Sequence, residues 1–170
     1  DGVTVSNLAI SGTTAPIFLR LGDRGRSLNR EGPRPAVAAL QNVVINNVVA
    51  TGADRIGCAI AGLPDHPIRN VSLTDVRITF VGGGVASQPA AEVPEQPRTY
   101  PEPTMFGSLP TYGFYCRHVS GLTFRNVRVG FLQPDPRPGL VCDDVEDLEV
   151  DSFRAMIDPA ARCAFLFQNV

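Results

Sequence analysis

The fold of this 170-residue chain is decided by a stretch that reads Val43-Val44-Ile45-Asn46-Asn47-Val48-Val49-Ala50. Its apolar side chains alternate with period two, which is the geometry of a β-strand. At Asn47 the alternation slips by one residue, and this slip predicts two short strands joined by a bend. Because Asn47 shares parity with the apolar residues before it, we expect its side chain to point inward at the bend.

The same pattern recurs along the chain. Further copies occupy residues 3–10, 71–78, 122–129 and, in a weaker form, 148–155, and a Gly, Asn or Asp precedes every copy. The Asn-like positions 7, 47, 75, 126 and 152 are separated by 40, 28, 51 and 26 residues. A basic coil of about 26 residues, with loops inserted in two coils, fits these intervals. Inward Asn side chains of coils stacked about 4.8 Å apart would hydrogen-bond one another as a ladder.

A further short apolar strand belongs to each coil. These strands are expected at residues 17–19, 58–60, 114–116, 140–142 and 164–167. Three strands per coil predict an all-β fold, a right-handed parallel β-helix or solenoid. A β-sandwich is the alternative, but hairpin turn signals are sparse and the phase slip recurs. Residues 1–170 would then form a single, partial β-helix domain, a fragment with open ends.

Two inserted loops interrupt the coils, at about residues 20–36 and 81–113. The first contains five Arg among Gly and Pro, and the second contains three consecutive Gly and six Pro. Long loops in a compact domain are usually functional or disordered. We expect order at residues 100–106, where aromatic side chains could dock, and mobility around residues 86–92.

Composition excludes several classes of protein. Gly and Pro together number 31, which argues against coiled coils and helical bundles. The net charge is −2 without a continuous basic stripe, which argues against a nucleic-acid partner. No apolar run approaches the roughly 18 residues of a membrane span. The chain has no Lys, so its 15 cations are all Arg. An Arg-rich loop fits acidic sugars, because guanidinium pairs bidentately with carboxylate, but a solvated loop is the alternative.

The four cysteines, Cys58, Cys116, Cys142 and Cys163, form no Cys-x-x-Cys pair. Zinc binding is therefore a weak reading, and we predict neither a metal nor a cofactor. Small buried apolar residues are the favoured interpretation of these cysteines.

Candidate site residues cluster at the ends of two predicted short strands. Asp143 and Asp144 could face one site only at a bend, and capping that turn is the structural alternative. His118 holds the same place in its coil as Asp144, so stacking should put His118 beside Asp144 and Arg117 beside Asp143. Such contacts would be ion pairs between coils or the remnant of a site. The candidate substrate-binding residues are Arg20, Arg24, Tyr112, Arg117, His118, Asp143 and Asp144.

These segments resemble the later coils of glycoside hydrolase family 28, the polygalacturonase and rhamnogalacturonase family. The likeness rests on the Asn-bearing coils and on residues 15–22. Pieces of residues 100–119, together with residues 135–138 and 143–145, look like bacterial members of the family. The resemblance implies an extracellular or periplasmic enzyme that hydrolyses galacturonate-containing, pectin-like polysaccharide with inversion and without a cofactor.

The family's catalytic motifs are Asn-Thr-Asp, an Asp pair after a small residue or Gln, His-Gly, and Arg-Ile-Lys, and none is found here. Asp143 and Asp144 follow a Cys, whereas the family's Asp pair usually precedes one, so no catalytic residue is assigned. We expect the catalytic coils upstream in the same protein and this segment alone to be inactive. The alternative is a non-catalytic β-helical carbohydrate-binding or structural module. A pectate lyase-like enzyme would need a calcium site of several carboxylates.

Overall fold

The computed structural model describes residues 1–27, 32–85 and 92–170, and these residues are nearly all β-strand or loop. One short 3-10 helix, η2 (Pro103–Phe106), is present, and the described residues contain no α-helix. The strands are β1 (Val3–Ser11), β2 (Phe18–Arg20), β3 (Gln41–Ala53), β4 (Cys58–Ala61), β5 (Ile68–Gly82), β6 (Phe114–Gln133), β7 (Leu140–Asp151), β8 (Arg154–Ala155) and β9 (Phe165–Gln168).

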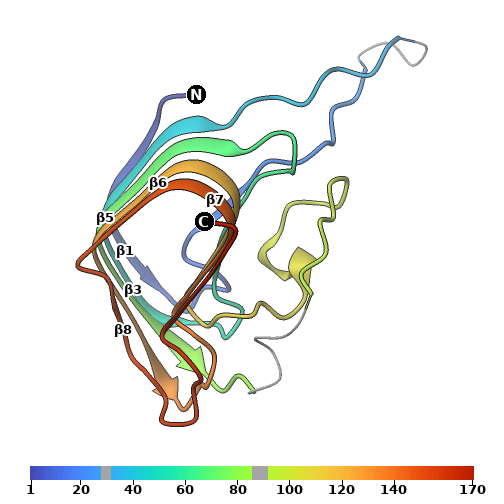
Figure 1. The fold of residues 1–170 in the computed structure, drawn as a ribbon. Coiled ribbons are helices and arrows are strands. Elements are labelled where there is room, and N and C mark those ends of the chain that lie inside the picture. The colour runs from blue at the N-terminus through green and yellow to red at the C-terminus, as the bar shows by residue number, and fades with distance from the viewer. Residues whose placement is uncertain (28–31, 86–91) are drawn as a thin grey trace.

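The strands form one curled sheet, a half-barrel, in which all pairs of named strands are parallel (Figure 1). Along the sheet the order is β1-β3-β5-β6-β4-β2, while β7 pairs with β6 and β9. The long strand β6 pairs with β4 near its start and with β5 further on. It therefore bends, and its two parts belong to two differently oriented regions of the curled sheet. A β-sandwich is built from antiparallel sheets, so the parallel pairing does not fit that alternative.

The copies of the repeat stack in register, as predicted. Val3 pairs with Val43, Val43 with Val71, Val71 with Leu122, and Leu122 with Leu148. The predicted short strands also pair one above another, at Phe18, Ala59, Tyr115, Val141 and Leu166.

The Asn-like positions bend the strands, but the prediction that their side chains point inward is wrong. Asn7, Asn47 and Asp75 are exposed, and Asn126 is half-buried. Their backbones are left-handed, with φ between 50° and 58°. A left-handed residue breaks the strand's alternation, so parity with the preceding residues no longer gives the direction of the side chain. Two pairs of the expected ladder form at the surface instead: Asn47 Nδ2 donates to Asn7 Oδ1 at 2.6 Å, and Asn126 Nδ2 to Asp75 Oδ1 at 2.5 Å.

A second column of bends explains the residue that precedes each copy. Gly2, Asn42, Asn70, Gly121 and Asp147 all have positive φ, between 53° and 76°. Only Gly adopts this region freely, and Asn and Asp follow because their short side chains hydrogen-bond locally. Asn70 Nδ2 also donates to Asn42 Oδ1 of the neighbouring strand at 2.9 Å.

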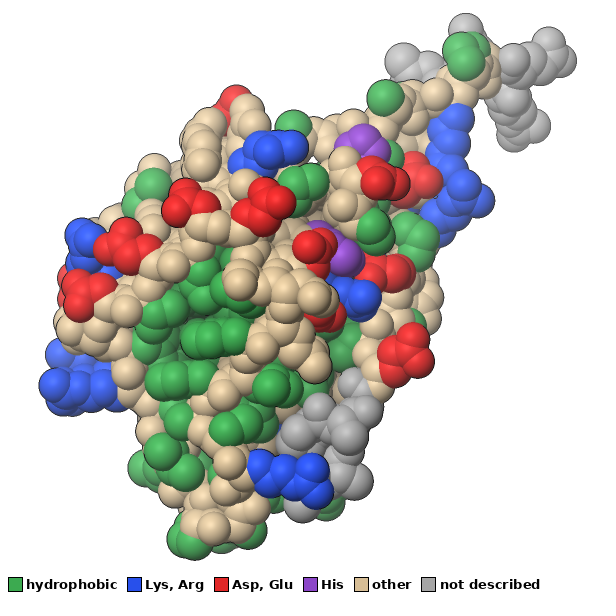
Figure 2. Space-filling view, in the orientation of Figure 1, with side chains coloured by type: hydrophobic (Ala, Val, Ile, Leu, Met, Phe, Trp, Pro, Cys, Tyr) green, Lys and Arg blue, Asp and Glu red, His purple; other side chains and the backbone are tan. Residues whose placement is uncertain are grey.

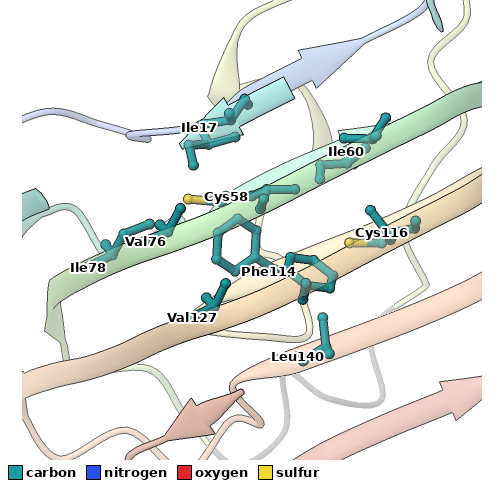
Figure 3. Packing of buried hydrophobic residues seen from close by; sticks show 14 of the residues in the cluster. Ile17, Cys58, Ile60, Val76, Ile78, Phe114, Cys116, Val127 and Leu140 are labelled. Atoms are coloured by element: carbon teal, nitrogen blue, oxygen red, sulfur yellow. The ribbon is translucent and has the colours of Figure 1, made fainter. Parts of the chain in front are cut away.

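The concave side of the sheet is filled by an interior cluster of buried Ile, Val, Leu, Phe and Cys side chains (Figure 3). Cys58, Cys116 and Cys142 lie in this cluster, Cys163 is half-buried, and all four are free thiols. Burial raises the pKa of Cys58 to about 12. The interpretation of the first three cysteines as small buried apolar residues is confirmed.

The two long connections lie where the sequence places them. Described residues between β2 and β3 form no strand, and the second connection runs from the end of β5 to the start of β6. Within it, η2 confirms the expected order, with Phe106 buried, while Tyr100 remains 65% exposed. The expected mobility around residues 86–92 falls mainly on residues 86–91, which lie outside the described residues.

Candidate functional site

A cluster of charged residues lies where the short strands of β6 and β7 end in bends. Arg117 pairs in register with Asp143, and Arg117 Nε lies 3.3 Å from Asp143 Oδ2. In the next position, His118 Nδ1 lies 2.5 Å from Asp144 Oδ2. His118 and Asp144 both have left-handed backbones, with φ of 52° and 57°. The predicted pairings of His118 with Asp144 and of Arg117 with Asp143 are therefore confirmed.

Glu95 completes this cluster, although no sequence pattern indicated it. Its Oε1 lies 2.7 Å from Arg117 Nη2 and 3.0 Å from His118 Nε2. Both ring nitrogens of His118 thus face carboxylates, and only 8% of the His118 side chain is exposed. Glu95 belongs to the connection between β5 and β6, which we call the proline-rich connection. This connection has no repeat, so no periodicity could have placed Glu95 beside β6.

Arg20 joins the same cluster but through backbone oxygens. Its guanidinium donates to the carbonyl oxygen of Gly62 at 2.6 Å and to that of Glu95 at 2.5 Å, and lies 5.2 Å from the centre of the Phe106 ring. Burial lowers the pKa of the Arg20 guanidinium, while Glu95 raises it, and an arginine remains charged throughout. Arg20 therefore holds β4 and the proline-rich connection together at the end of β2.

Two further candidates lie away from the cluster. Arg24 is exposed and lies 4.9 Å from the centre of the Tyr100 ring, a cation–π contact within the loops. Tyr112 is fully buried in the interior cluster, and its hydroxyl donates to the carbonyl oxygen of Met156 at 2.7 Å. Burial raises the pKa of Tyr112. Tyr112 thus has no exposed surface for a substrate, and we remove it from the candidate binding residues.

The proline-rich connection covers the outer side of the short strands. In the ribbon, η2 and its flanking segments lie outside the curled sheet (Figure 1). An outer cluster of buried apolar residues forms there, on the face opposite the interior cluster. Met105 and Phe106 of η2, with Val93 and Leu109, pack against residues of β4, β6 and β7. Phe106 also contacts the Phe18 ring, with centroids 6.4 Å apart. The outer face of β4 is therefore occupied by this chain's own side chains.

The charged cluster holds segments of the chain together, and we call it the clamp. Its members are Glu95, Arg117, His118, Asp143 and Asp144. An inverting glycosidase needs two carboxyl groups roughly 6.5–9.5 Å apart on either side of the scissile bond, which leaves room for a water beside the basic one. Here Glu95, Asp143 and Asp144 each contact Arg117 or His118 instead. These ion pairs tie the proline-rich connection to two neighbouring strands, above the outer cluster. Among the described residues, no group of three or more His, Cys, Asp or Glu side chains is placed to hold a metal ion.

The fold and the clamp define a class, a parallel-β protein whose coil-like repeats curl around an apolar interior. Comparison of the chain with models of protein families, with curated proteins and with solved structures found no match. Within the described ranges, no helix has the length and apolar character needed to cross a bilayer.

Proposed function

We propose that this chain is part of a right-handed parallel β-helix belonging to a polygalacturonase-like glycoside hydrolase. The observation that carries the proposal is the in-register stack of the repeat, with two columns of left-handed Asn, Asp and Gly residues. A polypeptide that repeats this unit along an axis winds into a solenoid. The proposed activity is based on the resemblance of these coils to glycoside hydrolase family 28.

The N-terminal edge of the sheet supports further coils in the same protein. Among the strands that the structure describes, β1 pairs only with β3, and Val3 and Leu8 are 41% and 40% exposed. Apolar residues around Val5, Leu8 and Ile17 line a hollow of about 180 Å³ at this edge. One more parallel coil would pair the free edge of β1 and cover these side chains.

The opposite end also leaves apolar surface uncovered. Hydrophobic side chains gather in the middle of this face, with acidic side chains along part of the rim (Figure 2). Phe153 and Phe165 are half-buried there, and Phe167 is 46% exposed. Both ends thus support the interpretation of the chain as a segment of a longer solenoid.

The substrate of the whole enzyme would be a galacturonate-containing, pectin-like polysaccharide, and the enzyme would be extracellular or periplasmic. Inverting hydrolysis needs one carboxyl group to protonate the leaving oxygen and another to activate water. Each carboxylate of the clamp is held by a contact with Arg117 or His118, so both catalytic groups would come from coils stacked before β1. This segment would support those coils.

A second candidate is a non-catalytic β-helical module that binds carbohydrate or serves as a structural element. The outer cluster favours it, because the proline-rich connection fills the face of the short strands where a polymer could otherwise lie. Catalysis by the whole protein distinguishes the two candidates.

The test is release of reducing sugar from polygalacturonate and rhamnogalacturonan by the full-length gene product. We expect release by that protein and none by the 170-residue segment alone. Activity of the isolated segment would overturn the placement of catalysis in other coils. A full-length protein that binds polygalacturonate without cleaving it would establish the non-catalytic module.

A further inference from the structure

A cavity of about 430 Å³ lies away from the charged clamp. It is bounded by the turn between β3 and β4, by the segment that follows β5, and by residues in and after η2. Pockets that bind small ligands generally have volumes of about 300–1,000 Å³. The cavity is therefore large enough for a small ligand or for one unit of a polymer.

The floor of the cavity is a rigid, neutral ion pair. Arg137 is almost fully buried, and its Nη2 lies 2.6 Å from Asp135 Oδ2 while its Nε donates to Asp135 Oδ1 at 2.9 Å. Arg137 Nη2 also donates to the carbonyl oxygen of Arg55 at 2.8 Å, which fixes the turn between β3 and β4. Asp135 in turn accepts the N–H of Gly84 at 2.9 Å. One buried pair thus positions two walls of the cavity.

This arrangement requires Gly at position 84, because the backbone there passes very close to the side chains of Arg137 and Asp135. A Cβ at Gly84 would lie 2.2 Å from Arg137 Nε and 2.5 Å from Asp135 Oδ1. The chain therefore passes directly over the ion pair at a position where a side chain has no room. The side chains of the floor are therefore fixed before any ligand binds, and such preorganisation lowers the entropic cost of binding.

The mouth of the cavity carries one cation and one anion. Arg55 is exposed, and its guanidinium makes no ion pair or hydrogen bond within the described part of the chain. Neighbouring Asp54 is exposed, and its Oδ1 accepts the backbone N–H of Arg55 at 2.6 Å. The remaining polar lining comes from the hydroxyls of Thr104 and Ser108.

These groups match an acidic sugar better than a phosphate. A free guanidinium binds a carboxylate through paired, charge-assisted hydrogen bonds. Asp54 offers acceptors to sugar hydroxyls, and Thr104 and Ser108 both donate and accept. The Asp54 carboxylate repels a doubly charged phosphate more strongly than a singly charged uronate, because the repulsion grows with the charge of the ligand.

We propose that this cavity is a binding subsite for one uronic acid residue of an oligosaccharide, with Arg55 binding the carboxylate. The inference rests on the proposed function for its substrate class. It adds a site in the segment that carries no catalytic group, on the turn between β3 and β4. The subsite would hold the polysaccharide away from the point of cleavage.

Arginine modification of the wild-type protein tests the site directly. Phenylglyoxal labelling of the full-length protein, read by peptide mass spectrometry, should modify Arg55 and also Arg77, an exposed residue of β5 outside the cavity. Trigalacturonate should protect Arg55 and leave Arg77 unchanged. Neutral galactotriose and inorganic phosphate at the same concentrations should protect neither. Equal protection by phosphate or by galactotriose would overturn the assignment of a uronate.

A matched pair of variants gives the affinity. Arg55→Gln should weaken trigalacturonate binding about tenfold or more in calorimetry, the size expected for a lost charge-assisted contact. Arg77→Gln should change it by less than about twofold, because exposed distant charges are screened. Equal effects of the two variants would overturn the subsite.

The two proposals fail in different ways. Hydrolysis of polygalacturonate without protection of Arg55 would remove the subsite and leave the hydrolase. Protection of Arg55 by trigalacturonate in a protein that cleaves no uronate would support the subsite and remove the hydrolase.

Discussion

The two sides of the curled sheet are both apolar, but they are built differently. On the concave side, the interior cluster is made by side chains that recur in each copy of the repeat and stack in register. On the convex side, the outer cluster depends on a single connection whose residues Val93, Met105, Phe106 and Leu109 dock on the short strands. The interior cluster is a property of the repeat, whereas the outer cluster is a property of one insertion.

This difference predicts that substitutions in the two clusters affect stability differently. Loss of an interior side chain weakens contacts among several strands at once, so the whole sheet should lose stability. Loss of an outer contact should release the connection while the sheet stays folded, because local opening costs less than global unfolding. The clamp of Arg117, His118 and Glu95 and the pair of Asp135 and Arg137 fasten that connection at separate points.

The largest effect is expected in the interior cluster. Phe124 is fully buried and contacts the rings of Phe114 and Phe153, with centroids 5.3 and 5.4 Å away. Phe124→Ala should lower the free energy of unfolding by about 3–5 kcal/mol in urea titrations. Leu132→Ala, on the same strand at a side chain 64% exposed, should change it by about 0.5 kcal/mol or less. Similar losses for both variants would contradict the interior assignment.

The buried ion pair comes next. Asp135→Asn leaves the Arg137 guanidinium buried without its counter-charge, which costs about 3–5 kcal/mol when no acceptor remains. Asn keeps an acceptor and Arg137 keeps the carbonyl oxygen of Arg55, so we expect a loss of about 3 kcal/mol, at the lower end of that range.

The Asp135 pair also predicts a pH dependence. Burial would raise the pKa of the Asp135 carboxyl, but the hydrogen bonds and charge of Arg137 and the N–H of Gly84 outweigh it and lower the pKa. A lowered folded-state pKa stabilises the protein above the unfolded value of about 3.9, and this stability is lost as the pH falls through the folded value. The stability gap between wild type and Asp135→Asn should therefore shrink below about pH 4. A gap that stays constant from neutral to acid pH would show that the pair contributes no such linkage.

The outer cluster should respond locally. Phe106→Ala should cost about 2 kcal/mol in global unfolding, less than the range of about 3–5 kcal/mol for an enclosed Phe, because the connection can detach. Limited proteolysis should then cut faster between residues 92 and 113, with the sheet protected. Tyr100→Ala is the control on the same connection, since Tyr100 is 65% exposed. If Phe106→Ala unfolds the whole sheet as Phe124→Ala does, the two clusters are one cooperative unit.

The smallest effect is expected at the surface ladder. Asn47 combines φ of 51° with a hydrogen bond to Asn7. Asn47→Ala should lower the free energy of unfolding by about 1–2 kcal/mol, because Ala is strained in the left-handed region. Asn47→Gly relieves that strain and loses only the ladder bond, roughly 0.5–1 kcal/mol. Thermal denaturation of the two variants separates the contribution of backbone strain from that of the hydrogen bond to Asn7. A Gly variant less stable than the Ala variant would refute the backbone explanation.

Much of the fold could be predicted because repetition makes distant residues equivalent. The spacing of the copies placed Val43, Val71 and Leu122 in one column, and the structure pairs them. The same equivalence placed His118 beside Asp144. The inward direction of Asn47 was predicted wrongly, because strand parity does not hold across a left-handed residue. The burial of Tyr112 could not be predicted, because this residue lies between a loop and β6, outside any repeated pattern.

The sequence by itself determined the repeating unit: the strands, their bends and the residues that fill the concave side. It could do so because alternation and left-handed Asn, Asp and Gly act locally and recur in the copies of the repeat. Only the tertiary structure decided that Glu95 faces His118, that Phe106 covers the outer side of the short strands, and that Arg55 borders a cavity above Arg137. These contacts join nonrepeating connections to the sheet, and they depend on packing between residues that no periodicity relates.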